Sequence, residues 1–310
     1  MPKIFVSTAP FGEIDHTPIE LLERSGLDYT INPLGRKLKP EEIGEMAKDC
    51  DGLIAGTEKI DIVLRTANKL QIIVRVGIGL DSVPLEKCRK QGITLAYTPD
   101  AVTKAVVELT IGLMVSGPRQ VALADRQLRR GEWYRLQGKR VGESIIGLIG
   151  FGRIGSNVAR LLAEFQPREV LINDLKDKSS VLEQLRQEKN LNIRQVSKEE
   201  IYQHADIVSL HVPLSPKTRN LICEETIQQF RQKAFLLNTA RGGIVNEQDL
   251  YQALQQKRIA GAAVDVFEKE PYSGPLAELE NVILTQHMGS CSYDCRRDME
   301  VQATEEIIRF

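Results

Sequence analysis

Three glycines in one short stretch restrict the fold of this 310-residue chain more than any other feature. Gly150, Gly152 and Gly155 follow the apolar run 145–149 and precede a segment, 156–165, whose apolar residues recur at helical spacing. In a strand–turn–helix unit, Gly150 permits the tight turn, Gly152 lets a pyrophosphate approach the backbone, and Gly155 lets the helix pack closely on the strand. The helix start then offers N–H groups and a positive dipole end to phosphates. The stretch indicates dinucleotide binding, although three glycines could also simply form a turn.

A second apolar run, 169–173, follows this helix and ends at Asp174, nineteen residues after Gly155. A Rossmann unit places its ribose-binding carboxylate at about this distance. An Asp at a strand end could instead be a turn residue or the cap of the next helix. With the glycine pattern before it, Asp174 favours ribose binding, and its charge would repel a 2′-phosphate, so NAD is favoured over NADP. Lys176 lies nearby in the sequence and weakens that preference.

The composition excludes several classes of protein. A net charge of −1 gives no electrostatic attraction to nucleic acid or to an anionic membrane, and no apolar run approaches the ~18 residues of a membrane span. The five cysteines are scattered without a C-x-x-C pair, so we expect no metal site. The N-terminus begins on a strand-like run and lacks the organisation of a signal peptide. We therefore expect a cytoplasmic protein that binds neither nucleic acid nor membrane.

Alternating strand-like and helical patterns predict parallel sheets covered by helices. Pro99 marks a break, and 101–130 then reads as one long helix, with a kink or split expected from Gly112 and Gly117-Pro118. Such a helix is a natural crossing between two α/β domains. Strands are expected at 4–8, 27–31, 52–55, 72–76 and 93–96 in the first part, and at 145–149, 169–173, 193–196, 206–210, 234–238, 261–266 and 282–284 in the second.

Polar residues follow the later strands, at the end where doubly wound sheets bind ligands. Arg241 lies in a glycine-flanked turn, and its guanidinium can fork onto a carboxylate and polarise a carbonyl, although a surface arginine would look the same. Asp265 lies within an apolar run, where an unpartnered carboxylate is costly, so we expect it to accept a defined hydrogen bond, for example from a ligand amide. Glu268 and Glu270 are both candidate acids, and the residues alone do not choose between them.

His287 is one of only four histidines and follows a short apolar strand. A lone histidine is usually structural or solvated. A histidine at a strand end with an acid to orient it is also a plausible proton donor near neutral pH.

Together these residues resemble the D-isomer-specific 2-hydroxyacid dehydrogenase family, especially its D-3-phosphoglycerate dehydrogenase-like members, over essentially the whole chain. The matching stretches are Arg75–Asp81, Glu108–Leu113, Gly147–Gly155, His211–Asn220, Asn238–Gly243 and Asp265–Pro271.

The resemblance implies an NAD-dependent dehydrogenase with three catalytic residues. Arg241 would bind the substrate carboxylate and carbonyl, His287 would be the general acid/base, and Glu270 would pair with His287 and favour its protonated form. The backbone around Val76 and Gly77 would hold the substrate carboxylate.

The resemblance also implies the cofactor contacts. Arg153 and Ile154 would meet the pyrophosphate, Asp174 the adenosine ribose, and Asp265 the nicotinamide carboxamide. The other implied cofactor residues are Gly150, Gly152, Gly155, Thr103, His211, Val212, Pro213, Thr218, Thr239, Ala240 and Gly289.

The implied architecture is α/β, with two doubly wound parallel-sheet domains and a cleft between them. A flavodoxin-like substrate domain would comprise 1–98 and 287–310, and a Rossmann-type NAD domain would comprise 99–286. The resemblance also implies a homodimer formed through the long helix and the loop that carries Trp133.

The chain departs from the family pattern at two places. Gln286 stands where the family usually has a proline before the catalytic histidine, which leaves the placement of His287 less constrained. The turn 56–59 reads Gly-Thr-Glu-Lys, without the arginine common in members that act on phosphoglycerate. Arg75, Lys59 and Arg135 could still meet a phosphate, or could be solvated surface cations.

The residues therefore leave the substrate open. D-3-phosphoglycerate and its keto acid, 3-phosphohydroxypyruvate, are the first expectation. Reduction of glyoxylate or hydroxypyruvate is the alternative, favoured by the missing arginine. A different class, an NADH-sensing corepressor-like binding protein, is also compatible with the retained catalytic residues.

Overall fold

The computed structural model describes all 310 residues, which form two compact units. Unit 1 comprises Met1–Ala105 and Ser290–Phe310, and unit 2 comprises Val106–Gly289. The first boundary falls inside helix α5 (Val102–Ser116), because this helix begins in unit 1 and continues into unit 2. No helix combines the length and the apolar character that a membrane crossing needs.

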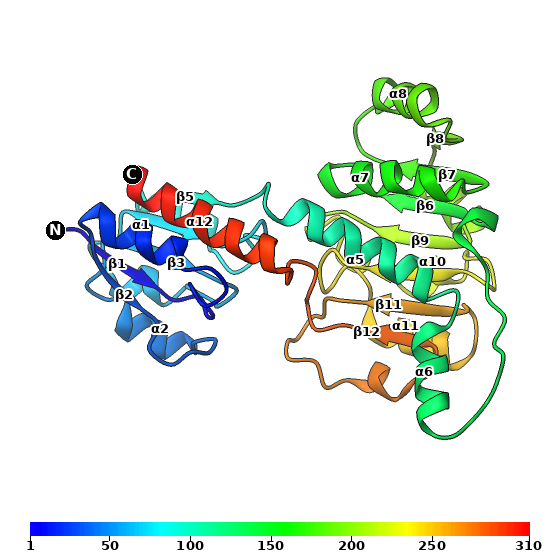
Figure 1. Cartoon of the computed structure of the whole chain (residues 1–310), viewed down its shortest axis with the longest axis horizontal. Coiled ribbons are helices and arrows are strands. Elements are labelled where there is room, and N and C mark those ends of the chain that lie inside the picture. Colours follow the sequence, from blue (N-terminus) through cyan, green and yellow to red (C-terminus); the bar gives the residue numbers. More distant parts are fainter. The chain divides into compact units, whose positions relative to one another are not determined.

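Unit 1 is a five-stranded parallel sheet with the strand order β2-β1-β3-β4-β5, which is the flavodoxin-like order. Helix α12, coloured red, returns from the end of the chain and packs against α1, coloured blue (Figure 1). The elements are β1 (Lys3–Val6), α1 (Thr17–Ser25), β2 (Asp28–Ile31), α2 (Pro40–Met46), β3 (Gly52–Ala55), α3 (Val63–Thr66), β4 (Ile72–Arg75), α4 (Leu85–Lys90), β5 (Thr94–Tyr97) and α12 (Tyr293–Arg309).

Local sequence explains where the helices of unit 1 begin and end. Helix α1 has Pro18 in its first turn and ends at Gly26, whose φ of 72° is the left-handed conformation that glycine adopts easily. Helix α2 begins with Pro40, and the Glu42 side chain accepts the backbone N–H of Lys39 at 2.8 Å. The apolar residues of β3 and β4 are buried on both faces, as expected for central strands of a parallel sheet.

Unit 2 is a seven-stranded parallel sheet with the order β12-β11-β10-β9-β6-β7-β8. If β6 is renumbered as strand 1 and the sheet is read from β8, the first six strands have the Rossmann order 3-2-1-4-5-6. Strand β12 then extends the sheet beyond β11 as a seventh strand. Besides α5, the elements are α6 (Val121–Arg129), β6 (Ile145–Ile149), α7 (Arg153–Leu162), β7 (Glu169–Asn173), α8 (Ser179–Lys189), β8 (Ile193–Gln195), α9 (Lys198–His204), β9 (Ile207–Leu210), α10 (Glu224–Ile227), β10 (Phe235–Asn238), α11 (Glu247–Gln255), β11 (Gly261–Val264) and β12 (Val282–Leu284), with short 3-10 turns at Val141–Glu143, Ala163–Phe165 and Pro275–Glu278.

Alternate strand residues of unit 2 enter two separate cores. Ile146 and Leu148 of β6 belong to one apolar cluster, whereas Ile149 belongs to the other. This is the two-residue side-chain period of a strand, and both faces of the sheet are covered (Figure 1). The predicted α/β class with two parallel sheets is therefore confirmed.

The segment 101–130 forms two helices instead of one continuous helix. Helix α5 ends at Ser116, and α6 begins at Val121 after Gln120, whose φ is 57°. Gly112 causes no break, whereas Gly117 begins the turn and lies against the Phe235 ring, where a Cβ would come within 2.2 Å of a ring carbon. The split thus occurs at Gly117-Pro118, because proline cannot continue a helix and no side chain fits beside Phe235.

Candidate active site

The candidate residues of unit 2 all follow strands of one parallel sheet, so they lie along its C-terminal edge. The cofactor candidates between Gly150 and Thr218 follow β6, β7 and β9, which are neighbours in the sheet. The catalytic candidates follow β10, β11 and β12, which are also neighbours, and so do the other cofactor candidates of this unit, Thr239, Ala240, Asp265 and Gly289. The residues at these strand ends are Gly150, Asp174, His211, Arg241, Asp265 and His287.

The three glycines of the first turn differ in what surrounds them. A Cβ on Gly150, whose φ is 96°, would lie 2.5 Å from the carbonyl oxygen of His211, and one on Gly155 would lie 2.2 Å from the carbonyl oxygen of Gly150. A Cβ on Gly152 would meet no atom within 4 Å. Gly152 therefore leaves open space above the start of α7, where the first N–H groups have no partner within the helix. This open cradle fits the pyrophosphate of a dinucleotide.

Asp174 is tied to the glycine turn. Its Oδ2 accepts the N–H of Phe151 at 2.8 Å, its Oδ1 accepts the N–H of Lys176 at 2.9 Å, and the Lys178 ammonium lies 3.7 Å from Oδ1. Burial by itself raises the pKa of Asp174, but the two N–H donors and Lys178 outweigh burial and lower the pKa below its ordinary value. The side-chain cation beside the carboxylate is thus Lys178, whereas Lys176 contributes its backbone.

The loop after β9 contains further predicted cofactor residues. Burial lowers the pKa of His211 to about 4, and its Nε2 has no hydrogen-bond partner. The Thr218 hydroxyl donates to the carbonyl oxygen of Pro213 at 2.6 Å and accepts the N–H of Ser215 at 2.8 Å, which closes this loop. Val212 contacts the core cluster on one face of the sheet.

Two threonines outside this loop are also predicted to contact the cofactor. The Thr239 hydroxyl lies 3.0 Å from the hydroxyl of Thr110 on α5, so the end of β10 is hydrogen-bonded to that helix. Thr103 belongs to unit 1, unlike the other predicted cofactor residues.

Asn238 shapes the turn that carries Arg241. The Asn238 Nδ2 donates to the carbonyl oxygen of Arg241 at 2.9 Å, and its Oδ1 accepts the N–H of Ala240 at 3.2 Å. Arg241 Nη1 in turn donates to the carbonyl oxygen of Ala240 at 2.6 Å. A Cβ on Gly242 would lie 2.0 Å from the carbonyl oxygen of Phe267. The Arg241 turn therefore packs directly on the loop that leads to Glu270.

Asp265 holds the loop that carries His287. Its side chain is almost fully buried, at 1% exposed. The Oδ1 atom accepts hydrogen bonds from the Thr285 hydroxyl at 2.5 Å and from the N–H of Met288 at 2.9 Å. The Oδ2 atom accepts a hydrogen bond from the N–H of Gly289 at 3.0 Å. The N–H of His287 donates to the carbonyl oxygen of Asp265 at 2.8 Å. These bonds hold His287 at a φ of 52°, a conformation that a residue with a side chain rarely adopts.

Of the two candidate acids, Glu270 is the one that contacts His287. Its carboxylate oxygens lie 3.0 and 2.9 Å from His287 Nδ1, and the side chains of the two residues are 31% and 38% exposed. Glu268 instead lies 3.8 Å from Arg219. A carboxylate at Nδ1 fixes the ring's orientation and its tautomer and leaves Nε2 as the ring nitrogen that is available to exchange a proton.

Apart from Arg241, the predicted substrate residues lie in unit 1, at the end of β4. The N–H of Val76 donates to the carbonyl oxygen of Ala55 at 2.8 Å, and the N–H of Gly77 donates to Thr98 Oγ1 at 2.7 Å. A Cβ on Gly77 would lie 2.1 Å from Arg75 Nη1, so the Arg75 guanidinium lies against this glycine.

A carboxyl group occupies the neighbouring strand end of unit 1. Glu58 follows β3 and is only 3% exposed. Its Oε1 accepts the N–H of Gly56 at 2.9 Å and the hydroxyl of Ser7, which is fully buried. Since β3 and β4 are paired, with Ala55 opposite Arg75, this carboxyl lies one strand away from the Val76–Gly77 segment.

Sequence reasoning assigned no part to Asn238, Thr285, Lys178 or Glu58. Asn238 had a usable signal, because an asparagine at a strand end commonly bonds backbone groups two or three residues on. Lys178 stands at an i,i+4 spacing from Asp174. Thr285 and Glu58 had no signal, because their partners, Asp265 and Ser7, are distant in the sequence.

Comparison with known proteins gives one family. Residues 111–289 match the model of the D-isomer specific 2-hydroxyacid dehydrogenase, NAD binding domain. A glyoxylate reductase of Korarchaeum cryptofilum is 35% identical over 276 residues, which cover 86% of this chain and 81% of the relative.

Two further proteins extend this likeness. A D-3-phosphoglycerate dehydrogenase of Methanocaldococcus jannaschii is 37% identical over 87% of this chain, and the match spans about half, 51%, of that relative. Among solved structures, the TT0316 protein of Thermus thermophilus superposes with a TM-score of 0.86 at 31% identity, covering 98% of this chain and 94% of that one.

Proposed function

The chain belongs to the D-isomer specific 2-hydroxyacid dehydrogenase family, and we propose that it reduces a short, unphosphorylated 2-keto acid such as glyoxylate or hydroxypyruvate. The family assignment makes it an NAD-dependent enzyme that interconverts 2-hydroxy and 2-keto acids.

The residue roles rest on the geometry of unit 2. NADH, when bound at the Gly152 cradle with its ribose at Asp174, supplies the hydride. Arg241, held by the Asn238 turn, binds the substrate carboxylate and polarises the carbonyl. His287 donates the proton to the developing alkoxide, and the Glu270 carboxylate at Nδ1 orients the ring for that transfer. Asp265 holds the His287 loop through three side-chain hydrogen bonds.

The observation that carries the substrate proposal is Glu58. The expectation of phosphoglycerate favours an arginine in the turn after β3. In this chain the turn combines a buried carboxyl group, bonded to Gly56 and Ser7, with one exposed lysine, Lys59. A phosphate placed beside that carboxyl would be repelled, because like charges brought together at low solvent exposure cost several kcal/mol. Glyoxylate and hydroxypyruvate carry no second anionic group, so they avoid this repulsion. The Korarchaeum cryptofilum relative is named a glyoxylate reductase, which agrees with this choice.

The test is a steady-state comparison of three keto acids with NADH, followed by the absorbance of NADH. We expect kcat/KM to be highest for glyoxylate or hydroxypyruvate and at least about tenfold lower for phosphohydroxypyruvate. A kcat/KM for phosphohydroxypyruvate that equals or exceeds the other two would overturn the proposal.

Two variants test the substrate preference and the proton transfer separately. Glu58→Gln keeps the shape and removes the charge, so it should raise kcat/KM for phosphohydroxypyruvate relative to glyoxylate. His287→Ala should lower kcat strongly for every substrate while NADH affinity stays nearly unchanged. Loss of NADH binding in His287→Ala would mean that this residue has a different role.

The exposed surface of unit 2 also supports a homodimer, which we propose as the assembly. Helix α6 has no buried residue, and the neighbouring Trp133 and Tyr134 are 79% and 64% exposed. Large exposed aromatic side chains in one segment are typical of protein interfaces. Light scattering on the purified protein tests this, and a monomeric mass at micromolar concentration would contradict it.

A further inference from the structure

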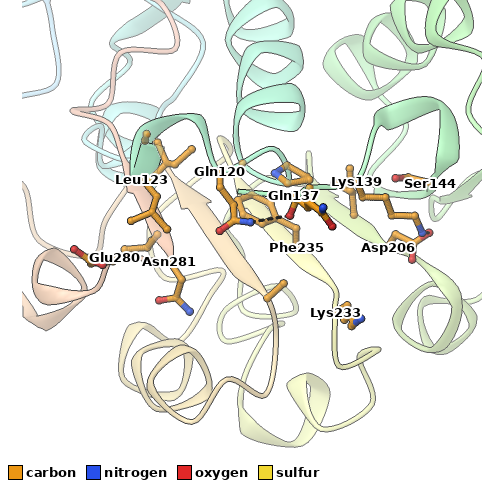
Figure 2. Close-up of a pocket in the computed structure, with 18 of the residues that line it drawn as sticks. Gln120, Leu123, Gln137, Lys139, Ser144, Asp206, Lys233, Phe235, Glu280 and Asn281 are labelled. Atoms are coloured by element: carbon orange, nitrogen blue, oxygen red, sulfur yellow. Dashed lines mark hydrogen bonds and ion pairs between the residues drawn. The ribbon is translucent and has the colours of Figure 1, made fainter. Parts of the chain in front are cut away.

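Charged side chains gather at both edges of the unit 2 sheet. At the edge where the strands begin, Asp206 and Lys139 lie in a cavity of about 480 Å³ (Figure 2), and helix α6, which also lines it, belongs to the surface proposed for the dimer. At the edge where the strands end, the carboxyl groups of Glu247, Glu268 and Glu270 lie near one another. Of these three, only Glu270 has a proposed part in the reaction, so the position of Glu247 needs an explanation.

Glu247 is the first residue of α11, and the residue before it already caps this helix. Asn246 Oδ1 accepts the N–H groups of Gln248 and Asp249, both at 3.1 Å. The half-buried Glu247 side chain turns instead to the loop after β11, where its Oε1 accepts the N–H of Glu268 at 2.7 Å. Hydrogen bonds of this length between an N–H and a carboxylate are among the strong ones in proteins. Glu247 therefore fastens the start of α11 to that loop.

The backbone that Glu247 holds also holds the acid of the proposed catalytic pair. Glu270 Oε1 accepts the N–H of Phe267 at 3.1 Å, so the carboxylate is bonded to the residue just before Glu268. The same carboxylate contacts His287 Nδ1 through both of its oxygens. A shift of the peptide between Phe267 and Glu268 would therefore move the carboxylate relative to the imidazole ring.

The peptide between Phe267 and Glu268 is also the place where the two loops of the candidate site touch. A Cβ on Gly242 would lie 2.0 Å from the carbonyl oxygen and 2.6 Å from the nitrogen of this peptide, so the Arg241 turn packs directly on it. One hydrogen bond from Glu247 thus fixes a peptide that contacts the Arg241 turn and belongs to the Glu270 loop.

A carboxylate at this position carries an electrostatic cost. Burial raises the pKa of Glu247, and the negative charges of Glu268 and Glu270 raise it further, which outweighs the lowering by the N–H of Glu268. Glutamine has the same shape and also offers an oxygen to this N–H, but it carries no charge. Glu247→Gln would therefore keep the bond without the repulsion, so the bond and the charge can be tested separately.

We propose that Glu247 is a positioning residue for the reaction, because it holds the 267–270 loop through the N–H of Glu268 and thereby keeps the Glu270 carboxylate at His287 Nδ1. This inference rests on the proposed role of Glu270. Since Glu247 acts through the loop, its loss should lower kcat and leave KM and the affinity for NADH nearly unchanged.

The test compares kcat and KM of three variants at saturating NADH, with the keto acid that gives the highest kcat/KM. Glu247→Ala removes the acceptor and should lower kcat by about tenfold or more, whereas Glu247→Gln should retain most of the wild-type kcat. Asp249→Ala is the matched control, because Asp249 lies in the same helical turn and its carboxylate accepts the N–H of Glu224, at the start of α10, at 2.9 Å. It should retain the wild-type kcat. A loss in Glu247→Ala that is matched by either other variant would overturn the inference.

A double-variant cycle shows whether the effect passes through Glu270. Glu270→Gln alone should lower kcat, and adding Glu247→Ala should cause little further loss, because both changes disturb the same contact. A full additional loss in the double variant would overturn the inference. So would a wild-type kcat in Glu247→Ala beside a low kcat in Glu270→Gln, and the role of Glu270 would then stand. A wild-type kcat in Glu270→Gln would overturn that role and this inference together.

Discussion

Replacing Gly152 by alanine separates cofactor binding from folding. A Cβ at this position meets no protein atom within 4 Å, and the residue is the N-cap of α7 with an extended backbone. Exchanging glycine for alanine at an N-cap costs about 1 kcal/mol or less, so Tm without ligand should fall by about 4 °C at most. The added methyl group would stand where the proposed role of this turn places the pyrophosphate. We therefore expect the Kd for NADH to rise about tenfold or more, which corresponds to about 1.4 kcal/mol.

Gly155→Ala is the matched contrast in the same turn. Its Cβ would lie 2.2 Å from the carbonyl oxygen of Gly150, well inside ordinary contact, so the helix must move away from the strand. Overpacking of this kind costs about 1–3 kcal/mol, and Tm should fall by several degrees even without cofactor.

Gly112→Ala is the control for cofactor binding, since its Cβ also meets nothing within 4 Å and it lies inside α5, far along the sequence from the turn. Alanine favours a helix over glycine by up to about 1 kcal/mol, so Tm should rise slightly while NADH affinity stays unchanged. Thermal unfolding without ligand and NADH fluorescence titration measure the two effects. Wild-type NADH affinity in Gly152→Ala would refute the assignment of this turn to the pyrophosphate.

Three other perturbations test neighbouring parts of the site. Burial lowers the pKa of His211 from 6.5 to about 4, so the unfolded chain takes up a proton that the folded chain resists, and the free energy of unfolding should fall by about 3 kcal/mol between pH 6.5 and pH 4. His211→Asn should remove that part of the loss in urea titrations at both pH values, and an unchanged difference would contradict it. Gly242→Ala places a Cβ 2.0 Å from the Phe267 carbonyl oxygen and displaces the turn of the proposed substrate-binding arginine, so kcat should fall by about 100-fold with little change in NADH affinity. An unchanged kcat would show that catalysis does not depend on the close packing of the Arg241 turn against the loop that contains Phe267. Asp174→Ala removes the carboxylate that would repel a 2′-phosphate, so the ratio of NADH to NADPH affinity should fall by about tenfold, and a constant ratio would count against its ribose role.

The sequence by itself determined the fold class, the strands and the place of the glycine turn between β6 and α7. These properties follow from local patterns, because fully apolar runs bounded by turns predict buried parallel strands, and glycine spacing specifies a tight turn next to a helix. Gly117-Pro118 also predicted the break in the long helix, although the sequence did not show that Gly112 would remain helical.

Only the tertiary structure decided which side chains meet. Glu268 and Glu270 are equivalent in the sequence, and the path of the loop after β11 brings only Glu270 to Nδ1 of His287. The partners of Asp265 and the burial of Glu58 against Ser7 likewise depend on strand order, because they join residues twenty or more positions apart. Local patterns report whether a residue is buried and in which element, whereas contacts between loops depend on how the elements are ordered in space.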